Sequence, residues 1–297
     1  MMRTSKPFYV PALRMKAGEL HGIANLADDI KDPVLPYLVI PPRPERDSEL
    51  QGVLMDTESV PGAGIVLGRY WAGRRALLDV GHLFSDFGED RAGLWLPKAF
   101  ELARTARVDA IPVVPLADIE GGRLQAFKDS TAAGPLAMAV RIFANDLVDP
   151  REASGRIKRA LDGVGLPAEV IVALIDFTDA DFSLPDLVAG VIEGALHDLE
   201  SIARWHAIVA QGTNYPEVNP AAHSGDELVP RNEWTAWRQA TRFGVGTGDH
   251  LWFGDYAADC ATMIFGSGGG RAIRHYRYTT PTHWFVVRGA EIGTDTA

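Results

Sequence analysis

Short apolar runs rich in β-branched residues recur along the chain about every 25 to 45 residues. Most are nearly continuous rather than alternating, which is typical of strands buried on both faces of a parallel sheet. The spacings leave room for a helix between successive strands, as a parallel connection requires. Eight such runs are present: Phe8–Met15, Val34–Ile40, Ala76–Val80, Ala110–Leu116, Leu136–Phe143, Glu169–Phe177, His206–Gln211 and Leu251–Tyr256. The pattern predicts an α/β fold, a (β/α)8 TIM-type barrel.

The stretches between these runs predict helices with different clarity. Ser183–Ala203 carries one apolar stripe at helical spacing, and Ser183 with Asp186 resembles a capping box at its start. Pro41–Gly73 is rich in Pro and Gly, so we expect an irregular loop there before any helix. Further helices are predicted over Glu19–Ile30, Leu96–Arg107 and Ile157–Leu161.

Composition narrows the class of protein. The length fits one barrel domain over 1–297, with 271–290 as a C-terminal β-hairpin addition. A net charge of −10 argues against bulk nucleic-acid binding and against docking on an anionic membrane. The single cysteine, Cys260, excludes an intramolecular disulfide and fits a reducing compartment. Because no apolar run is long enough to span a bilayer and MMRTSKPFYVPAL lacks a signal-peptide core, we expect a cytoplasmic protein.

Charged residues stand at the ends of several predicted strands, where a barrel places its active site. Arg141 in AVRIF and Asp176 in LIDF are the clearest, because a charge inside an apolar strand is costly unless it is paired or lies at a cleft. One interpretation is an anion-binding arginine beside carboxylates that act as general acid, base or metal ligands. The alternative is a structural salt bridge that joins Arg141, Asp176 and Asp79.

The candidate residues fall into three groups by role. They are Asp176, Asp255 and Glu19 as catalytic residues, Lys16, Arg141, Gln211 and Tyr256 as substrate-binding residues, and Asp79, Asp176 and Asp255 as ligands of Mg²⁺ or Mn²⁺. For Glu19 an equally good interpretation is a helix start whose charge complements the helix dipole.

Other motifs carry weaker signals. Gly244–Asp249 (GVGTGD) follows a helix-like stretch and precedes a strand, the wrong order for a nucleotide fingerprint, so we interpret it as a loop. Gly266–Arg271 lacks the ending of a Walker loop, although its amides and Arg271 suit an anion. The histidines show no zinc spacing, no GxSxG elbow exists, and Cys260 has no evident base partner.

Two features near the C-terminus suit either packing or recognition. Trp234 and Trp237 lie three apart in a predicted helix, and we favour packing against the barrel over an aromatic ligand wall. Ala272–Thr279 and His283–Val287 predict a β-hairpin that ends the chain where a barrel would have a helix. The hairpin is basic for an acidic protein, which fits a solvated face or a partner-binding patch.

The order of YVPALRMKAGE, AVRIF, VALIDF, RNEWTAW, FGDYA and YRYTTPTHWFVVRG resembles the "beta protein" family of tailed bacteriophages and bacteria. The most distinctive elements are KxGE at Lys16–Glu19, GDY at Gly254–Tyr256 and RG at Arg288–Gly289. The resemblance implies a setting of bacteriophage infection or antiviral defence. It implies no established activity.

Two functions follow as hypotheses. The first is a hydrolase or lyase that acts at the barrel mouth on an anionic, phosphate-bearing small molecule or nucleotide. Arg141 and Lys16 would neutralise the anion, and Asp176 or Asp255 would act as base or hold a divalent ion. The second is a non-catalytic factor in phage infection or antiphage defence that binds a protein partner through the C-terminal hairpin.

Overall fold

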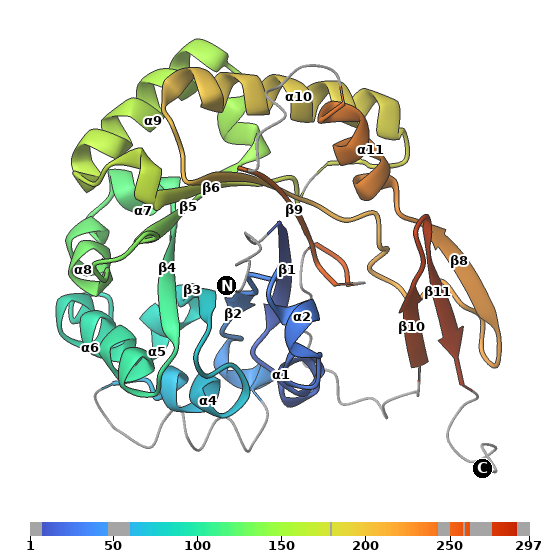
Figure 1. The fold of residues 1–297 in the computed structure, drawn as a ribbon, viewed down its shortest axis with the longest axis horizontal. Coiled ribbons are helices and arrows are strands. Elements are labelled where there is room, and N and C mark those ends of the chain that lie inside the picture. Colours follow the sequence, from blue (N-terminus) through green and yellow to red (C-terminus); the bar gives the residue numbers. More distant parts are fainter. Residues whose placement is uncertain are drawn as a thin grey trace.

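The chain folds around a closed barrel of eight parallel strands (Figure 1). The computed structural model describes residues 8–46, 60–178, 180–242, 250–257, 259–261 and 275–289. The barrel strands, each paired in parallel with the next, are β1 (Tyr9–Arg14), β2 (Tyr37–Val39), β3 (Arg75–Asp79), β4 (Asp109–Pro115), β5 (Met138–Phe143), β6 (Ile171–Asp176), β7 (Ala207–Gln211) and β9 (Leu251–Asp255). Each predicted run supplies one of them, so the predicted (β/α)8 barrel is confirmed.

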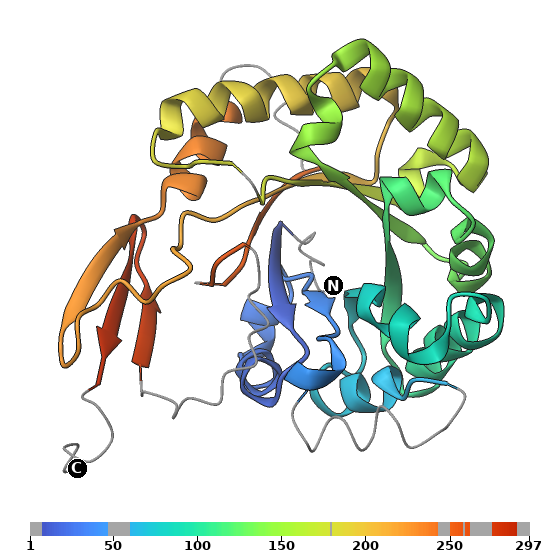
Figure 2. The same ribbon diagram turned by 180° about the vertical axis from the view of Figure 1, so that it is seen from behind.

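Helices surround the barrel, and both ribbon views show them outside the strands (Figures 1 and 2). Among the described residues, the α-helices are α1 (Ala17–Ala24), α2 (Asp28–Lys31), α4 (Ala63–Tyr70), α5 (Phe84–Phe87), α6 (Ala92–Thr105), α7 (Leu116–Glu120), α8 (Leu124–Ser130), α9 (Pro150–Val164), α10 (Pro185–Ile202) and α11 (Asn232–Ala240). Short 3-10 turns are η1 (Arg43–Glu45), η2 (Gly81–Leu83), η3 (Ala144–Leu147) and η4 (Ala168–Val170).

Two helix predictions were wrong in detail. The single helix expected over Glu19–Ile30 is two, because the backbone becomes extended at Ala27 and Ile30 is exposed rather than part of an apolar face. The capping box expected at Ser183 is absent, since the N-cap of α10 is Leu184 and no side chain caps that end. The irregular loop expected within Pro41–Gly73 stays a prediction, because 47–59 lie outside the described residues; η1 and α4 lie on either side of them.

The hydrophobic core has two layers, which the alternation of side chains along each strand separates. In β5, Val140 and Ile142 pack outward against the helices. Ala139, between them in the pleat, packs inside the barrel. Arg141 follows on the inward side, and Asp79 of β3 and Asp176 of β6 hold the corresponding inward positions at the ends of their strands.

A three-stranded antiparallel sheet lies beside the barrel, next to α11 and β9 in both views (Figures 1 and 2). The predicted hairpin is present as β10 (His275–Thr279) and β11 (His283–Arg288), while 272–274 lie outside the described residues. The third strand, β8 (Asp226–Pro230), pairs with β11 and was not predicted. This small sheet has its own apolar cluster, made of Tyr215, Ala221, Val229, Trp284 and Val286.

Candidate functional site

A network of charges occupies the carboxyl end of the barrel. The Arg141 Nε and Nη2 atoms donate to Asp176 Oδ2 at 2.8 and 2.5 Å, and its Nη1 donates to Asp79 Oδ2 at 3.4 Å. The two carboxylates come from β3 and β6, on either side of Arg141 in β5. Asp176 and Asp79 are buried. The salt bridge of the structural alternative is therefore present, and it leaves this cluster with one excess negative charge.

Three hydroxyl groups complete this network. Tyr37 donates to Asp79 Oδ2 at 2.8 Å, and Tyr256 donates to Asp176 Oδ1 at 3.0 Å, where the Thr178 hydroxyl also binds. Burial raises the pKa of both tyrosines, so they stay protonated as donors. Tyr37 and Thr178 were not among the predicted site residues, although a hydroxyl inside the apolar PYLVI run was a usable signal for Tyr37.

A cavity of about 150 Å³ opens beside this network. Tyr256 lines the cavity and also bonds to Asp176, so one side chain joins the two. The walls come from β1, α1, the turn after β9, and β10 of the small sheet. The lining residues are Ala12, Leu13, Arg14, Glu19, Tyr256, Ala257, Asp259 and Arg277.

Two arginines and two carboxylates supply the charge of the cavity. Arg14 Nε donates to Glu19 Oε1 at 2.8 Å, and its Nη2 forms an ion pair with Asp259. Arg277 Nη1 lies 3.7 Å from Asp259 Oδ1. Burial raises the pKa of Glu19, and the neighbouring Arg14 opposes that rise. A carboxyl group that lines a cavity with a raised pKa is suited to general acid–base chemistry.

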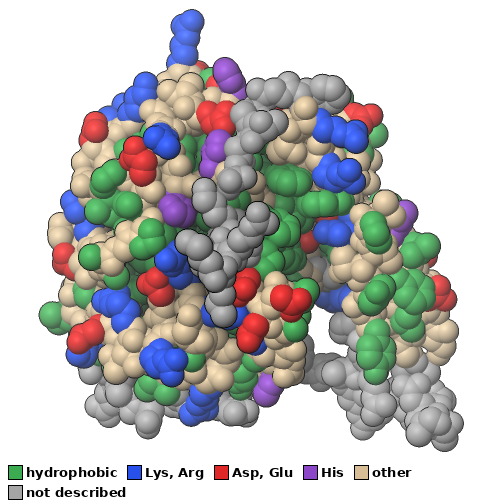
Figure 3. Space-filling model, viewed as in Figure 1, with side chains coloured by type: hydrophobic (Ala, Val, Ile, Leu, Met, Phe, Trp, Pro, Cys, Tyr) green, Lys and Arg blue, Asp and Glu red, His purple; other side chains and the backbone are tan. Residues whose placement is uncertain are grey.

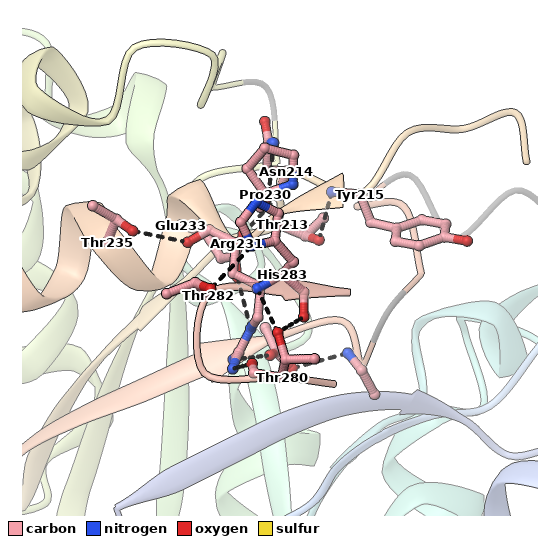
Figure 4. A network of polar contacts seen from close by, with 12 residues as sticks. Thr213, Asn214, Tyr215, Pro230, Arg231, Glu233, Thr235, Thr280, Thr282 and His283 are labelled. Carbon is pink, nitrogen blue, oxygen red and sulfur yellow. Dashed lines mark hydrogen bonds and ion pairs between the residues drawn. The ribbon is translucent and has the colours of Figure 1, made fainter. Parts of the chain in front are cut away.

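Asp255 belongs to a different network. It lies two residues after Phe253 in β9, and alternate residues of a strand face the same side, so Asp255 points away from the barrel interior as Phe253 does. The Tyr9 hydroxyl donates to Asp255 Oδ1 at 2.7 Å, and Arg231 Nη2 lies 3.5 Å from Asp255 Oδ2. Glu233 is also buried there, and its Oε1 lies 3.6 Å from Arg231 Nε (Figure 4).

The carboxylates considered for Mg²⁺ or Mn²⁺ do not meet at one point. Asp79 and Asp176 share Arg141, whereas Asp255 faces the other side of the barrel wall. Within the described ranges, no group of three or more His, Cys, Asp or Glu side chains is arranged to hold a metal ion.

Two predicted substrate-binding residues lie away from the cavity lining. Gln211 is fully buried at the end of β7, where its Nε2 donates to the Asp255 carbonyl at 2.6 Å. Lys16 Nζ lies 3.1 Å from Glu45 Oε2. Of the predicted site residues, Glu19 and Tyr256 line the cavity. Arg141 does not line it, but Arg141 and Tyr256 both donate hydrogen bonds to Asp176.

The tryptophan pair packs on the outside of the barrel, the alternative that we favoured. The rings of Trp234 and Trp237 stack with their centroids 5.2 Å apart. Both contact the ring of Phe253 in β9, with centroid distances of 4.9 and 5.6 Å, respectively. The glycine-rich segments Gly244–Asp249 and Gly266–Arg271 lie outside the described residues.

Fold and site together define a TIM-type barrel protein with a charged mouth and an added antiparallel sheet. Residues 9–297 match the family described as Beta protein, so the chain belongs to the Beta protein family. The resemblance found in the sequence is thereby confirmed. Comparison with curated proteins gave no match, and comparison with solved structures gave none. Among the described helices, none has the length and apolar character to cross a membrane.

Proposed function

We propose that this protein is an enzyme that acts at the barrel mouth on a small anionic molecule carrying a phosphate group, a nucleotide included, by hydrolysis or elimination. One observation carries the proposal, namely the cavity that is lined by the carboxyl group of Glu19 together with one arginine from the barrel and one from the small sheet. We also propose a cytoplasmic role in phage infection or antiphage defence, which the family resemblance supports.

Each polar group of the cavity has a role in this proposal. Arg14 and Arg277 supply positive charge for the phosphate oxygens, since guanidinium forks suit that geometry. Glu19 acts as general acid and base. In hydrolysis, a water oxygen bonds to phosphorus and gives its proton to Glu19. The bond from phosphorus to the leaving oxygen breaks, and that oxygen receives a proton from Glu19.

The Asp176 network supports the cavity rather than reacting. The Asp176 carboxylate already accepts from Arg141, Tyr256 and Thr178, so it has little capacity left for a substrate proton. Its part in the proposal is to orient Tyr256, which lines the cavity. Asp255 does not line the cavity, so it takes no part in the proposed reaction.

The test is a thermal-shift and turnover screen of nucleotides, sugar phosphates and divalent metals. A ligand at 100 times its dissociation constant stabilises the fold by about 2.7 kcal/mol. We expect a shift and turnover with the wild type, and loss of turnover in Glu19→Gln. The matched control is Glu200→Gln, because Glu200 pairs with His250 at 2.8 Å and does not line this cavity. Equal turnover in Glu19→Gln and the wild type would refute the assignment.

A second candidate function, binding of a partner protein, is favoured by the outer face of the small sheet. Tyr276, Tyr278 and Leu228 are 75%, 69% and 54% exposed, respectively. The strand register places Phe285 between Tyr278 and Leu228 in one row. Figure 3 shows apolar side chains gathered over this part of the molecule. Exposed aromatic rows are enriched in protein interfaces.

The test of this alternative uses tyrosines of the outer face. Trp234 packs on Phe253, and Arg277 lies over the Tyr215 ring at 4.7 Å, so neither belongs to the outer face. We expect Tyr276→Ser with Tyr278→Ser to abolish capture of a protein partner while leaving the melting temperature unchanged. Capture that survives this double substitution would exclude the surface.

A further inference from the structure

One carboxylate in the cavity lies between two arginines that belong to different parts of the fold. Asp259 forms an ion pair with Arg14 Nη2, from the barrel, and lies 3.7 Å from Arg277 Nη1, from the small sheet. We propose that Asp259 is an internal stand-in for the anionic group of the ligand, and that the ligand displaces it to bind between Arg14 and Arg277. This inference rests on the proposed function, because it concerns the same cavity.

The turn after β9 presents Asp259 in this position. Ala257 has φ of +51°, a left-handed conformation that is uncommon for a residue other than glycine. Its N–H donates to Asp255 Oδ1 at 2.9 Å, and the N–H of Asp259 donates to the Tyr256 carbonyl at 3.0 Å. Neither of these hydrogen bonds involves the Asp259 carboxylate, so the Asp259 side chain can leave the arginines without unfolding a strand.

The balance of charges in the cavity explains why an anionic ligand must displace a carboxylate. Arg14 and Arg277 are balanced by Glu19 and Asp259, so an incoming anion would add excess negative charge to a site that is three-quarters shielded from water. If the ligand replaces Asp259 between the arginines, both guanidinium groups keep a carboxylate-like or phosphate-like partner. The side chains of Arg14, Arg277 and Asp259 are 22%, 26% and 19% exposed, so solvent reaches the pair and exchange is feasible.

The chemistry of the pair defines the ligand as an oxyanion. Two guanidinium groups that share one carboxylate are arranged for an acceptor with at least two oxygens, such as a phosphate or a carboxylate. One of the two donors, Arg277, comes from β10, outside the barrel. The small sheet thus supplies a ligand-binding residue to the barrel mouth, which a barrel alone would lack.

The direction in which one substitution changes the affinity for phosphate tests this inference. Asp259→Asn keeps the shape and the bond from the Cys260 N–H to Oδ1, but it removes the competing charge. We expect at least tenfold tighter binding of inorganic phosphate, measured by calorimetry, in Asp259→Asn than in the wild type. Arg277→Gln should lose phosphate binding. The double variant Asp259→Asn with Arg277→Gln should not show the tighter binding expected of Asp259→Asn alone. Acetate, as a second probe, shows whether the site takes carboxylates as well.

The control variant is Asp109→Asn, since Asp109 pairs with Arg75 at 3.1 Å at the start of its strand, and we expect it to bind phosphate as the wild type does. Unchanged or weaker phosphate binding in a folded Asp259→Asn protein would overturn the stand-in role. If the wild type turns over a phosphate ester while phosphate binding is unchanged in Asp259→Asn, the proposed enzymatic function stands and only this inference is rejected. Tighter binding without turnover of any ester would support the inference and contradict the enzyme.

Discussion

At the scale of single residues, the barrel interior depends on a glycine opposite a buried amide. A Cβ atom added at Gly254 would lie 2.3 Å from Gln211 Oε1 and 3.1 Å from the Val10 carbonyl oxygen. Gln211 has no free space to retreat, because it is fully buried and its Nε2 is bonded to the Asp255 carbonyl. The glycine in FGDYA is therefore needed for close approach of β7 and β9 rather than for an unusual backbone angle.

We expect Gly254→Ala to lower the free energy of unfolding by about 1–3 kcal/mol, measured by urea denaturation, because overpacking forces Gln211 from its hydrogen bond. The matched control is Gly190→Ala, where nothing lies within 4 Å of an added Cβ. Gly190 is exposed within α10, so alanine there should stabilise by about 0.5–1 kcal/mol. If adding Gln211→Ala to Gly254→Ala does not recover stability, the clash is not the cause.

At the scale of elements, α11 carries a buried acid against the barrel wall. Glu233 accepts a hydrogen bond from the Asn214 N–H at 3.1 Å and faces Asp255 of β9 and Arg231 at the helix start. Burial, with the Asp255 carboxylate as a further cause, raises the pKa of Glu233 to about 7. The folded protein therefore holds this proton more tightly than the unfolded chain does.

The raised pKa of Glu233 sets the direction of a pH effect. Its contribution to stability is fully present below the pKa of an unfolded glutamate, about 4.3, and is lost as the pH rises through about 7. Glu233→Gln should thus match the wild type near pH 4 and exceed its free energy of unfolding at pH 8 by about 1–3 kcal/mol. Urea denaturation at both pH values measures this. Equal stability of the two proteins at pH 8 would contradict the prediction, and the surface variant Glu227→Gln is the control.

The elements that sequence analysis identified are those with a strong apolar signal. Most of the barrel strands are nearly continuous runs, since they are covered on both faces. The strand β8 was missed because DELVP has one buried side chain, Val229, and its remaining residues are exposed. The break between α1 and α2 was missed because the apolar spacing continues through it, whereas α1 ends at Ala24 and the extended backbone at Ala27 precedes α2.

At the scale of the whole molecule, the candidate site depends on parts that are far apart in sequence. Strand-end charges were predictable, since the fold fixes which end of each strand faces the mouth. The directions of their side chains were not predictable, because a shift of one position along the chain decides whether a side chain points inward, as that of Tyr256 does, or outward, as that of Asp255 does. The roles of Asp259 and Arg277 were not predictable either, as they arise from contact between the turn after β9 and a separate sheet.

The small sheet has a separate apolar core, so its stability should be separable from that of the barrel. Trp284 is buried in that core, with its ring 5.5 Å from Tyr215. Trp284→Ala removes a large buried side chain, a change that costs about 3–5 kcal/mol. We expect hydrogen exchange to accelerate in β8, β10 and β11 while the barrel strands keep their protection. Because Arg277 lies on β10, oxyanion binding at the mouth should weaken in the same variant. Accelerated exchange throughout the barrel strands would show instead that sheet and barrel unfold as one unit.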